Sequence, residues 1–145
     1  MLDPRAAMLE AEAAVVAADR ETDAVPPGGV ISVSARLADG REMVGEFTFM
    51  LPLSVNDQNR IGQISARLRG GMPVAAFAGD KAELLEMVAF LQVALRGAPG
   101  WAMDSTGAVN LGEMPTFIVG HIYREVEAHA GRFRDACQLR GPGQG

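Results

Sequence analysis

The sequence predicts a small α+β fold, with an N-terminal β-hairpin followed by a bundle of about three helices. Hydrophobic residues alternate over residues 30–37 and 41–51, and a period of two is typical of half-buried strands. Asp39-Gly40 stands between these strands, where a tight hairpin turn requires a residue that accepts a positive φ. Later segments repeat their apolar residues at helical spacing. Because a lone hairpin is not stable in water, we expect it to pack on these helices.

The hairpin is expected to bury one face. The residues that share this face are Ile31, Val33, Ala35 and Leu37 in the first strand and Met43, Gly45, Phe47, Phe49 and Leu51 in the second. Pro52 ends the second strand, since proline cannot donate to a ladder of hydrogen bonds.

The first helix is predicted over residues 55–69. Ser54 or Asn56 is suited to cap its N-terminus, because a short polar side chain accepts a hydrogen bond from the first free amide groups. Gly70-Gly71 is expected to end the helix. An apolar connector, residues 72–79, follows.

The second helix is predicted over residues 81–96 and is apolar nearly all round. Asp80 is expected to cap it, with Glu83 three residues later as in a capping box. Gly97 is expected to end it. A helix without a polar face is typically buried, so we expect this helix at the centre of the core.

The last helix is predicted over residues 115–136, after a loop over residues 102–113. Trp101, in a Pro-Gly-Trp turn, is expected to hold that turn on the core, although tryptophan is also common at partner contacts.

The chain divides into three parts. Residues 1–28 form an acidic, alanine-rich arm and a Pro/Gly linker, and alanine favours a further helix there. Residues 29–136 form a single α+β domain, and residues 137–145 form a flexible tail.

Composition excludes several classes of protein. The net charge of −5 argues against broad binding of nucleic acid, which requires a cationic face. A single cysteine cannot form an internal disulfide, which favours a cytoplasmic protein. Apolar runs stay shorter than the roughly 20 residues that span a membrane.

Candidate catalytic and metal-binding residues are few. His121, Glu125 and His129 are spaced four residues apart, but eight residues of helix separate the two histidines by about 12 Å along the axis. We therefore expect surface polar pairs and no metal site. Cys137 lies near the chain end, where positioning for nucleophilic catalysis is poor. We expect neither enzymatic activity nor a cofactor.

Six residues are candidates for partner binding: Phe77, Leu85, Phe90, Arg60, Arg67 and Trp101. The apolar ones could line an adaptable groove, or could belong to the core. With Arg69, the two arginines could contact an acidic partner or the acidic arm, or form an ordinary solvated face. If the apolar residues line a groove, removing Phe77, Leu85 and Phe90 weakens partner capture without preventing folding.

The order of short motifs adds a family resemblance. These motifs are the Phe-x-Phe-x-x-Pro stretch (Phe47, Phe49, Pro52), the Gly70-Gly71 break, the Pro99-x-Trp101 turn, and the helix 122–129 that continues to Phe133-Arg134. Over residues 29–136, the chain resembles the small tail assembly chaperones of long-tailed bacteriophages and related prophage elements.

The resemblance implies a non-enzymatic role in the host cytoplasm. Such proteins coat the helical tape-measure protein, help to recruit tail-tube subunits, and are absent from the finished particle; some relatives also yield a longer frameshift product. Three alternatives stay open: a structural neck or tail-completion protein, a small enzyme using Asp57, Arg60, His121 or His129, and a regulatory or immunity-type binder. The free hairpin edge also leaves a homo-oligomer open.

Overall fold

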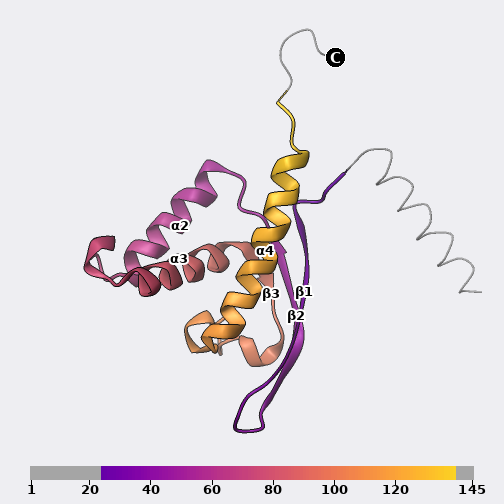
Figure 1. Cartoon of the computed structure of the whole chain (residues 1–145), viewed down its shortest axis with the longest axis vertical. Coiled ribbons are helices and arrows are strands. Elements are labelled where there is room, and N and C mark those ends of the chain that lie inside the picture. The colour runs from indigo at the N-terminus through magenta and orange to yellow at the C-terminus, as the bar shows by residue number, and fades with distance from the viewer. Residues whose placement is uncertain (1–23, 140–145) are drawn as a thin grey trace, which may run out of the picture. The chain divides into compact units, whose positions relative to one another are not determined.

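The computed structural model describes residues 24–139, of which Gly28–His129 form one compact unit. Its main elements are β1 (Gly28–Arg36), β2 (Glu42–Met50), α2 (Val55–Leu68), α3 (Gly79–Ala94), β3 (Leu95–Gly97) and α4 (Thr116–Ala136) (Figure 1). A three-stranded sheet of order β1-β2-β3 accompanies the three helices, so the α+β prediction is confirmed. The arm predicted to favour a further helix lies outside the described residues.

The hairpin forms as predicted. β1 pairs antiparallel with β2, from Gly28 opposite Met50 to Arg36 opposite Glu42. Gly40 has a φ of 91°, which explains the need for glycine in this turn.

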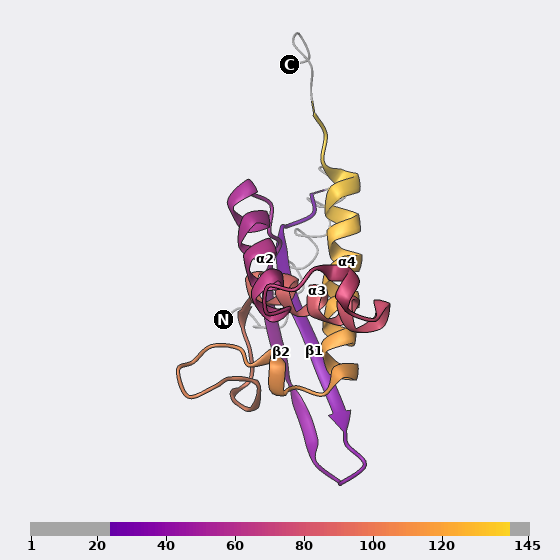
Figure 2. The same ribbon diagram turned by 90° about the vertical axis from the view of Figure 1, so that its left-hand side faces the viewer.

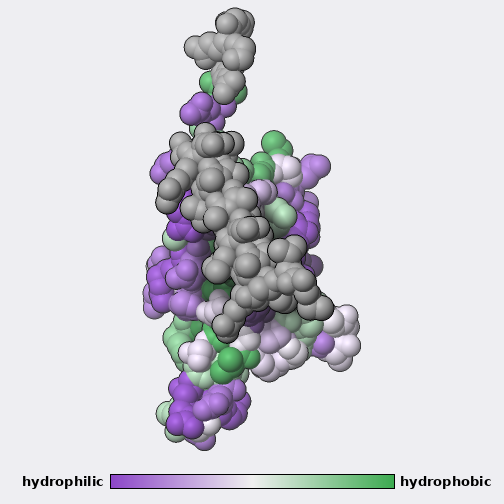
Figure 3. Space-filling view, turned by 90° about the vertical axis from the view of Figure 1, so that its right-hand side faces the viewer, coloured by the Kyte–Doolittle hydropathy of each residue, from purple (hydrophilic) through white to green (hydrophobic). Residues whose placement is uncertain are grey.

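One face of the hairpin is buried, as the alternation predicted. Ile31, Val33, Phe47 and Phe49 are each at most 5% exposed. The helices cover this face, and α4 runs beside β1 (Figures 1 and 2). Side chains of the opposite face are exposed, with Val30 at 57% and Val44 at 59%. Hydrophilic side chains gather on the hairpin turn at the lower end of Figure 3.

The two predicted helix caps have different outcomes. Ser54 caps α2 as expected: its hydroxyl accepts a hydrogen bond from the Asp57 amide at 3.0 Å, and Asp57 completes a capping box. The prediction that Asp80 caps the next helix is wrong. The cap position of α3 is Ala78, and Asp80 lies in the first helical turn, where its charge still complements the helix dipole.

The predicted helix over residues 81–96 is too long at its C-terminus. It ends at Ala94, and the next three residues form β3 on the edge of β2, with Leu95 opposite Phe49. A short buried apolar run suits either a helix or a strand, so periodicity alone could not separate them. Gly97 therefore belongs to a strand. A Cβ atom there would lie 2.6 Å from the Thr48 hydroxyl oxygen, so a larger residue would require the Thr48 side chain to move.

The core lies between the sheet, the C-terminal half of α3, and one face of α4. Its largest fully buried side chains are Phe47, Leu91, Leu111, Ile118, Ile122, Val119 and Val126. The prediction that the second helix is central holds for its C-terminal half. Leu84 and Leu85, nearer its start, are only half-buried.

A polar cluster joins α2 to α3. The buried hydroxyl of Ser65 donates a hydrogen bond to Glu86 and accepts one from Arg69. The Arg69 guanidinium also forms an ion pair with the Glu86 carboxylate, with 3.2 Å between Nη1 and Oε1. Its Nε donates a hydrogen bond to the Met72 carbonyl at 3.0 Å. This cluster holds the end of α2 and the chain that leaves it against α3.

Tyr123 connects α4 to α3. Its ring meets the ring of Phe90 edge-on, and the two ring centres are 5.6 Å apart. Burial, together with the nearby negative charge of Glu127 and Glu83, raises the pKa of Tyr123 above its ordinary value of 10.0. The folded state therefore favours the neutral phenol. The resulting contribution to stability is complete below about pH 10 and is lost as the pH rises through the folded-state pKa.

We expect the Tyr123→Phe variant to lose less stability than the wild type between about pH 9 and pH 11, because it has no phenol to ionise. Urea midpoints measured across this range for both proteins test the expectation. An equal alkaline loss in both would contradict it.

Candidate functional site

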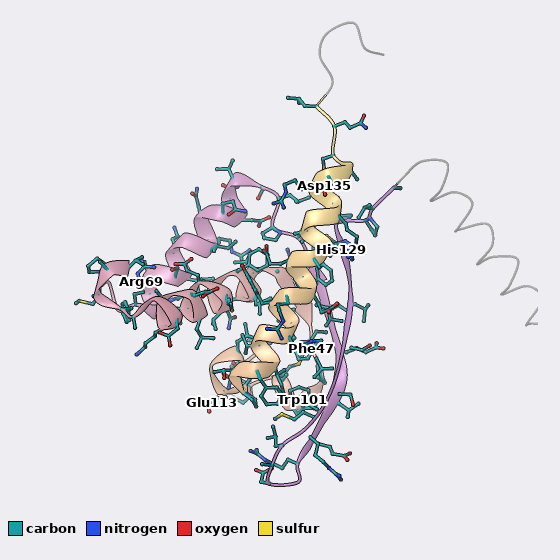
Figure 4. The ribbon with its side chains drawn as sticks, in the orientation of Figure 1. Phe47, Arg69, Trp101, Glu113, His129 and Asp135 are labelled. Carbon is teal, nitrogen blue, oxygen red and sulfur yellow. The ribbon has the colours of Figure 1, made fainter. Side chains whose placement is uncertain are left out.

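Trp101 has a structural role. Its indole N–H donates a hydrogen bond to the Val44 carbonyl at 3.0 Å, and its ring meets that of Phe47 edge-on at 5.8 Å (Figure 4). The expectation that this tryptophan holds its turn on the core is confirmed. Trp101 is nevertheless only half-buried, and its role as a partner anchor stays a prediction.

The other three apolar candidates do not form one patch. Phe90 packs on Tyr123 in the contact between α3 and α4. Leu85 is half-buried on α3. Phe77 lies in the connector between α2 and α3, with the ammonium of Lys81 at 5.7 Å from its ring centre. Only Phe77 of the three therefore lies beside a strongly exposed apolar segment.

The two candidate arginines, Arg60 and Arg67, are exposed on α2. Within residues 24–139, neither forms an ion pair. Arg69, grouped with them in the sequence, instead belongs to the Ser65 cluster. The arginine set is therefore divided: one member is structural, and two are available to solvent or to a partner.

The end of α2 and the connector between α2 and α3 expose an apolar surface. Of the six candidates, only Phe77 belongs to it. Leu68, Met72 and Val74 are 41%, 53% and 51% exposed, and Phe77 beside them is half-buried. We call these four residues the apex patch. Figure 4 labels Arg69 at this end of the two helices. In the sequence, the apex patch corresponds to the apolar run Met-Pro-Val-Ala-Ala-Phe between two glycine breaks. This run has neither the period of a strand nor that of a helix, so its pattern does not show which side chains are exposed.

The histidines have separate surroundings. The ring of His129 meets Phe49 edge-on at 5.2 Å, whereas His121 lines a pocket beside β1. Within the part of the chain that the structure describes, no three His, Cys, Asp or Glu side chains are grouped so as to hold a metal ion. Cys137 is exposed.

No family model matches the sequence, and no similar curated protein or solved structure was found. Across residues 24–139, every helix is too short or too polar to cross a membrane.

Proposed function

We propose that the protein is a non-enzymatic binding factor in phage tail assembly. In the host cytoplasm it holds the helical tape-measure protein in soluble form and helps to recruit tail-tube subunits. The observation that carries this proposal is the apex patch, and the motif resemblance of residues 29–136 supplies the partner class. A structural neck or tail-completion component is the second candidate, because the same kind of patch suits a permanent contact.

The apex patch has the chemistry that a long amphipathic helix requires. Its exposed side chains are aliphatic or thioether, and removing such surface from water stabilises a complex by about 25 cal/mol per Å². Met72 adds adaptability, because an unbranched thioether adjusts to differing apolar surfaces. A tape-measure protein presents many similar helical segments in succession, so an adaptable patch suits it better than one exact fit.

The patch is also held in place. Arg69 donates to the Met72 carbonyl, and the Phe77 amide donates to the Val74 carbonyl at 3.1 Å. The Ser65 cluster fixes this end of α2 to α3. A surface that is ordered before binding loses less conformational entropy when a partner docks. Arg60 and Arg67 on α2 add charge for acidic positions of the partner.

The decisive experiment is capture of the co-expressed tape-measure protein, encoded in the same genome, by the tagged protein. We expect the double variant Met72→Ser/Val74→Ser to reduce capture at least about tenfold, since exposed apolar contacts contribute most where they are central to an interface. Its thermal midpoint should stay close to that of the wild type, because neither side chain is buried. Capture is quantified at several bait concentrations by densitometry.

Val55→Ser is the matched control, because Val55 is an exposed aliphatic residue at the other end of α2. It should capture as the wild type does. Equal capture by the apex variant would reject the apex patch as the docking surface, and absence of capture by the wild type would reject the chaperone role. Stoichiometric presence of the protein in purified particles, measured by mass spectrometry, would favour the structural candidate instead.

A further inference from the structure

The outer edge of β1 is open within residues 24–139, because β1 is the terminal strand and pairs there only with β2. The Leu37 amide donates to the Arg41 carbonyl at 2.8 Å, so Leu37 and Arg41 occupy a hydrogen-bonded position of the ladder next to the turn. Hydrogen-bonded and non-bonded pairs alternate along an antiparallel ladder. The N–H and C=O groups of Val30, Ser32 and Ser34 therefore point away from β2, toward the open side.

A pocket of about 310 Å³ lies beside this edge, between β1 and α4. Its lining residues are Val33, Ser34, Ala35, Phe117, Ile118, His121 and Arg124. Phe117, in the first turn of α4, is 55% exposed, which is unusual for a large aromatic residue. Main-chain groups and an apolar pocket thus lie side by side, as they do where a peptide adds a strand to a sheet.

The pocket carries positive charge. This charge is that of Arg124, which is exposed and forms no ion pair with any residue of 24–139; the imidazole of His121 also lines the pocket. No carboxylate is among the lining residues. Phe117 and Arg124 are seven residues apart on α4, about 10 Å along the helix axis. An apolar site and a cationic site therefore follow one another along β1, at a distance that two to four residues of an extended chain span.

We propose that this edge binds an extended peptide segment as a fourth strand, with an apolar side chain in the pocket and a carboxylate on the same side of the segment reaching Arg124. This surface differs from the apex patch and does not depend on the proposed function. Main-chain hydrogen bonds provide affinity, and the pocket with Arg124 provides selectivity. A second copy is a poorer occupant, because pairing β1 with another β1 brings together two grooves of the same sign of charge.

The test measures fluorescence anisotropy of a labelled octapeptide, TVTETVTT, with the full-length protein. Its two valines and the glutamate share one side when extended. One comparison probe, TVTKTVTT, reverses the charge, and another carries N-methyl groups on alternate amides. We expect the lysine probe to bind about tenfold more weakly and the N-methylated probe to lose binding, because it cannot pair with the strand edge.

Two variants of the protein make the test specific. Ser34→Pro removes an outward N–H and should lower affinity more than tenfold, whereas Ser34→Thr retains it and should bind as the wild type does. Arg124→Glu should weaken the glutamate probe about tenfold and strengthen the lysine probe. Arg96→Glu, an exposed position on β3 at the other edge of the sheet, is the charge control and should change neither. Circular dichroism confirms that each variant is folded.

Several results would overturn the proposal. They are no saturation by the wild type with the glutamate probe, equal affinity for both charges, or undiminished binding of the N-methylated probe. A dimer in analytical ultracentrifugation that Ser34→Pro dissociates would also overturn it, since a second copy would then occupy the edge.

Discussion

Phe47→Ala is expected to lower the free energy of unfolding by about 3–5 kcal/mol, the usual cost of removing a large buried aromatic side chain. Phe47 is fully buried in β2 and meets the ring of Trp101 edge-on at 5.8 Å. Truncation removes this apolar surface and leaves a cavity beneath the sheet. It also removes the ring contact that helps to hold Trp101 on its turn. For one domain of this size, the loss is a large part of total stability.

Urea denaturation followed by circular dichroism and by Trp101 fluorescence measures the effect. Val44→Ala is the matched control: Val44 lies on the same strand but faces outward and is 59% exposed. It should change stability by no more than about 0.5 kcal/mol. A Phe47→Ala variant as stable as this control would show that Phe47 does not lie in the core.

Gly45→Ala is expected to destabilise the fold by about 1–3 kcal/mol through overpacking. An added Cβ at Gly45 would lie 2.5 Å from the Cβ and 2.6 Å from the Cγ of Pro99, a ring that cannot rotate away. The chain from Pro99 to Trp101 must therefore shift. We expect the hydrogen bond from the Trp101 indole to the Val44 carbonyl to weaken, with a red shift of tryptophan emission as water gains access.

Gly62→Ala is the opposite case and serves as the control. Gly62 lies inside α2, and an added Cβ there meets no atom within 4 Å. Alanine has the higher helix propensity and restricts the unfolded chain, so this variant should be more stable by about 0.5–1 kcal/mol. The same chemical change is thus expected to act with opposite sign at the two positions. Equal signs in urea denaturation would contradict the packing of β2 against Pro99.

Elements that depend on near neighbours in the chain were predictable. Alternation and the Asp39-Gly40 turn predicted the hairpin and its faces, and Ser54 was one of two residues expected to cap α2. The Asp80 prediction failed although the local pattern was similar. A cap requires a particular backbone position as well as a residue type, and α3 begins two residues earlier than predicted, with Ala78 at the cap position.

The candidate surfaces were less predictable. Side chains at helical spacing, such as Phe90, are indistinguishable in the sequence whether they contact another helix or a partner. The exposure of Met72 and Val74 depends on where the α2–α3 connector lies. The pocket beside β1 joins Ser34 to Phe117, which are far apart in the chain, and no local pattern relates them.

By itself, the sequence determined the fold class, the hairpin and its buried face, and the approximate extent of the three helices, because each depends on periodicity and turn chemistry within a few residues. Only the tertiary structure decided that Leu95–Gly97 leave the helix to pair with β2. It also decided that Trp101 packs on Phe47, that the apex patch is exposed, and that the outer edge of β1 pairs with no other strand of residues 24–139. These outcomes depend on contacts between segments that are far apart in the chain. The same apolar residue is buried where another segment packs on it and exposed where none does.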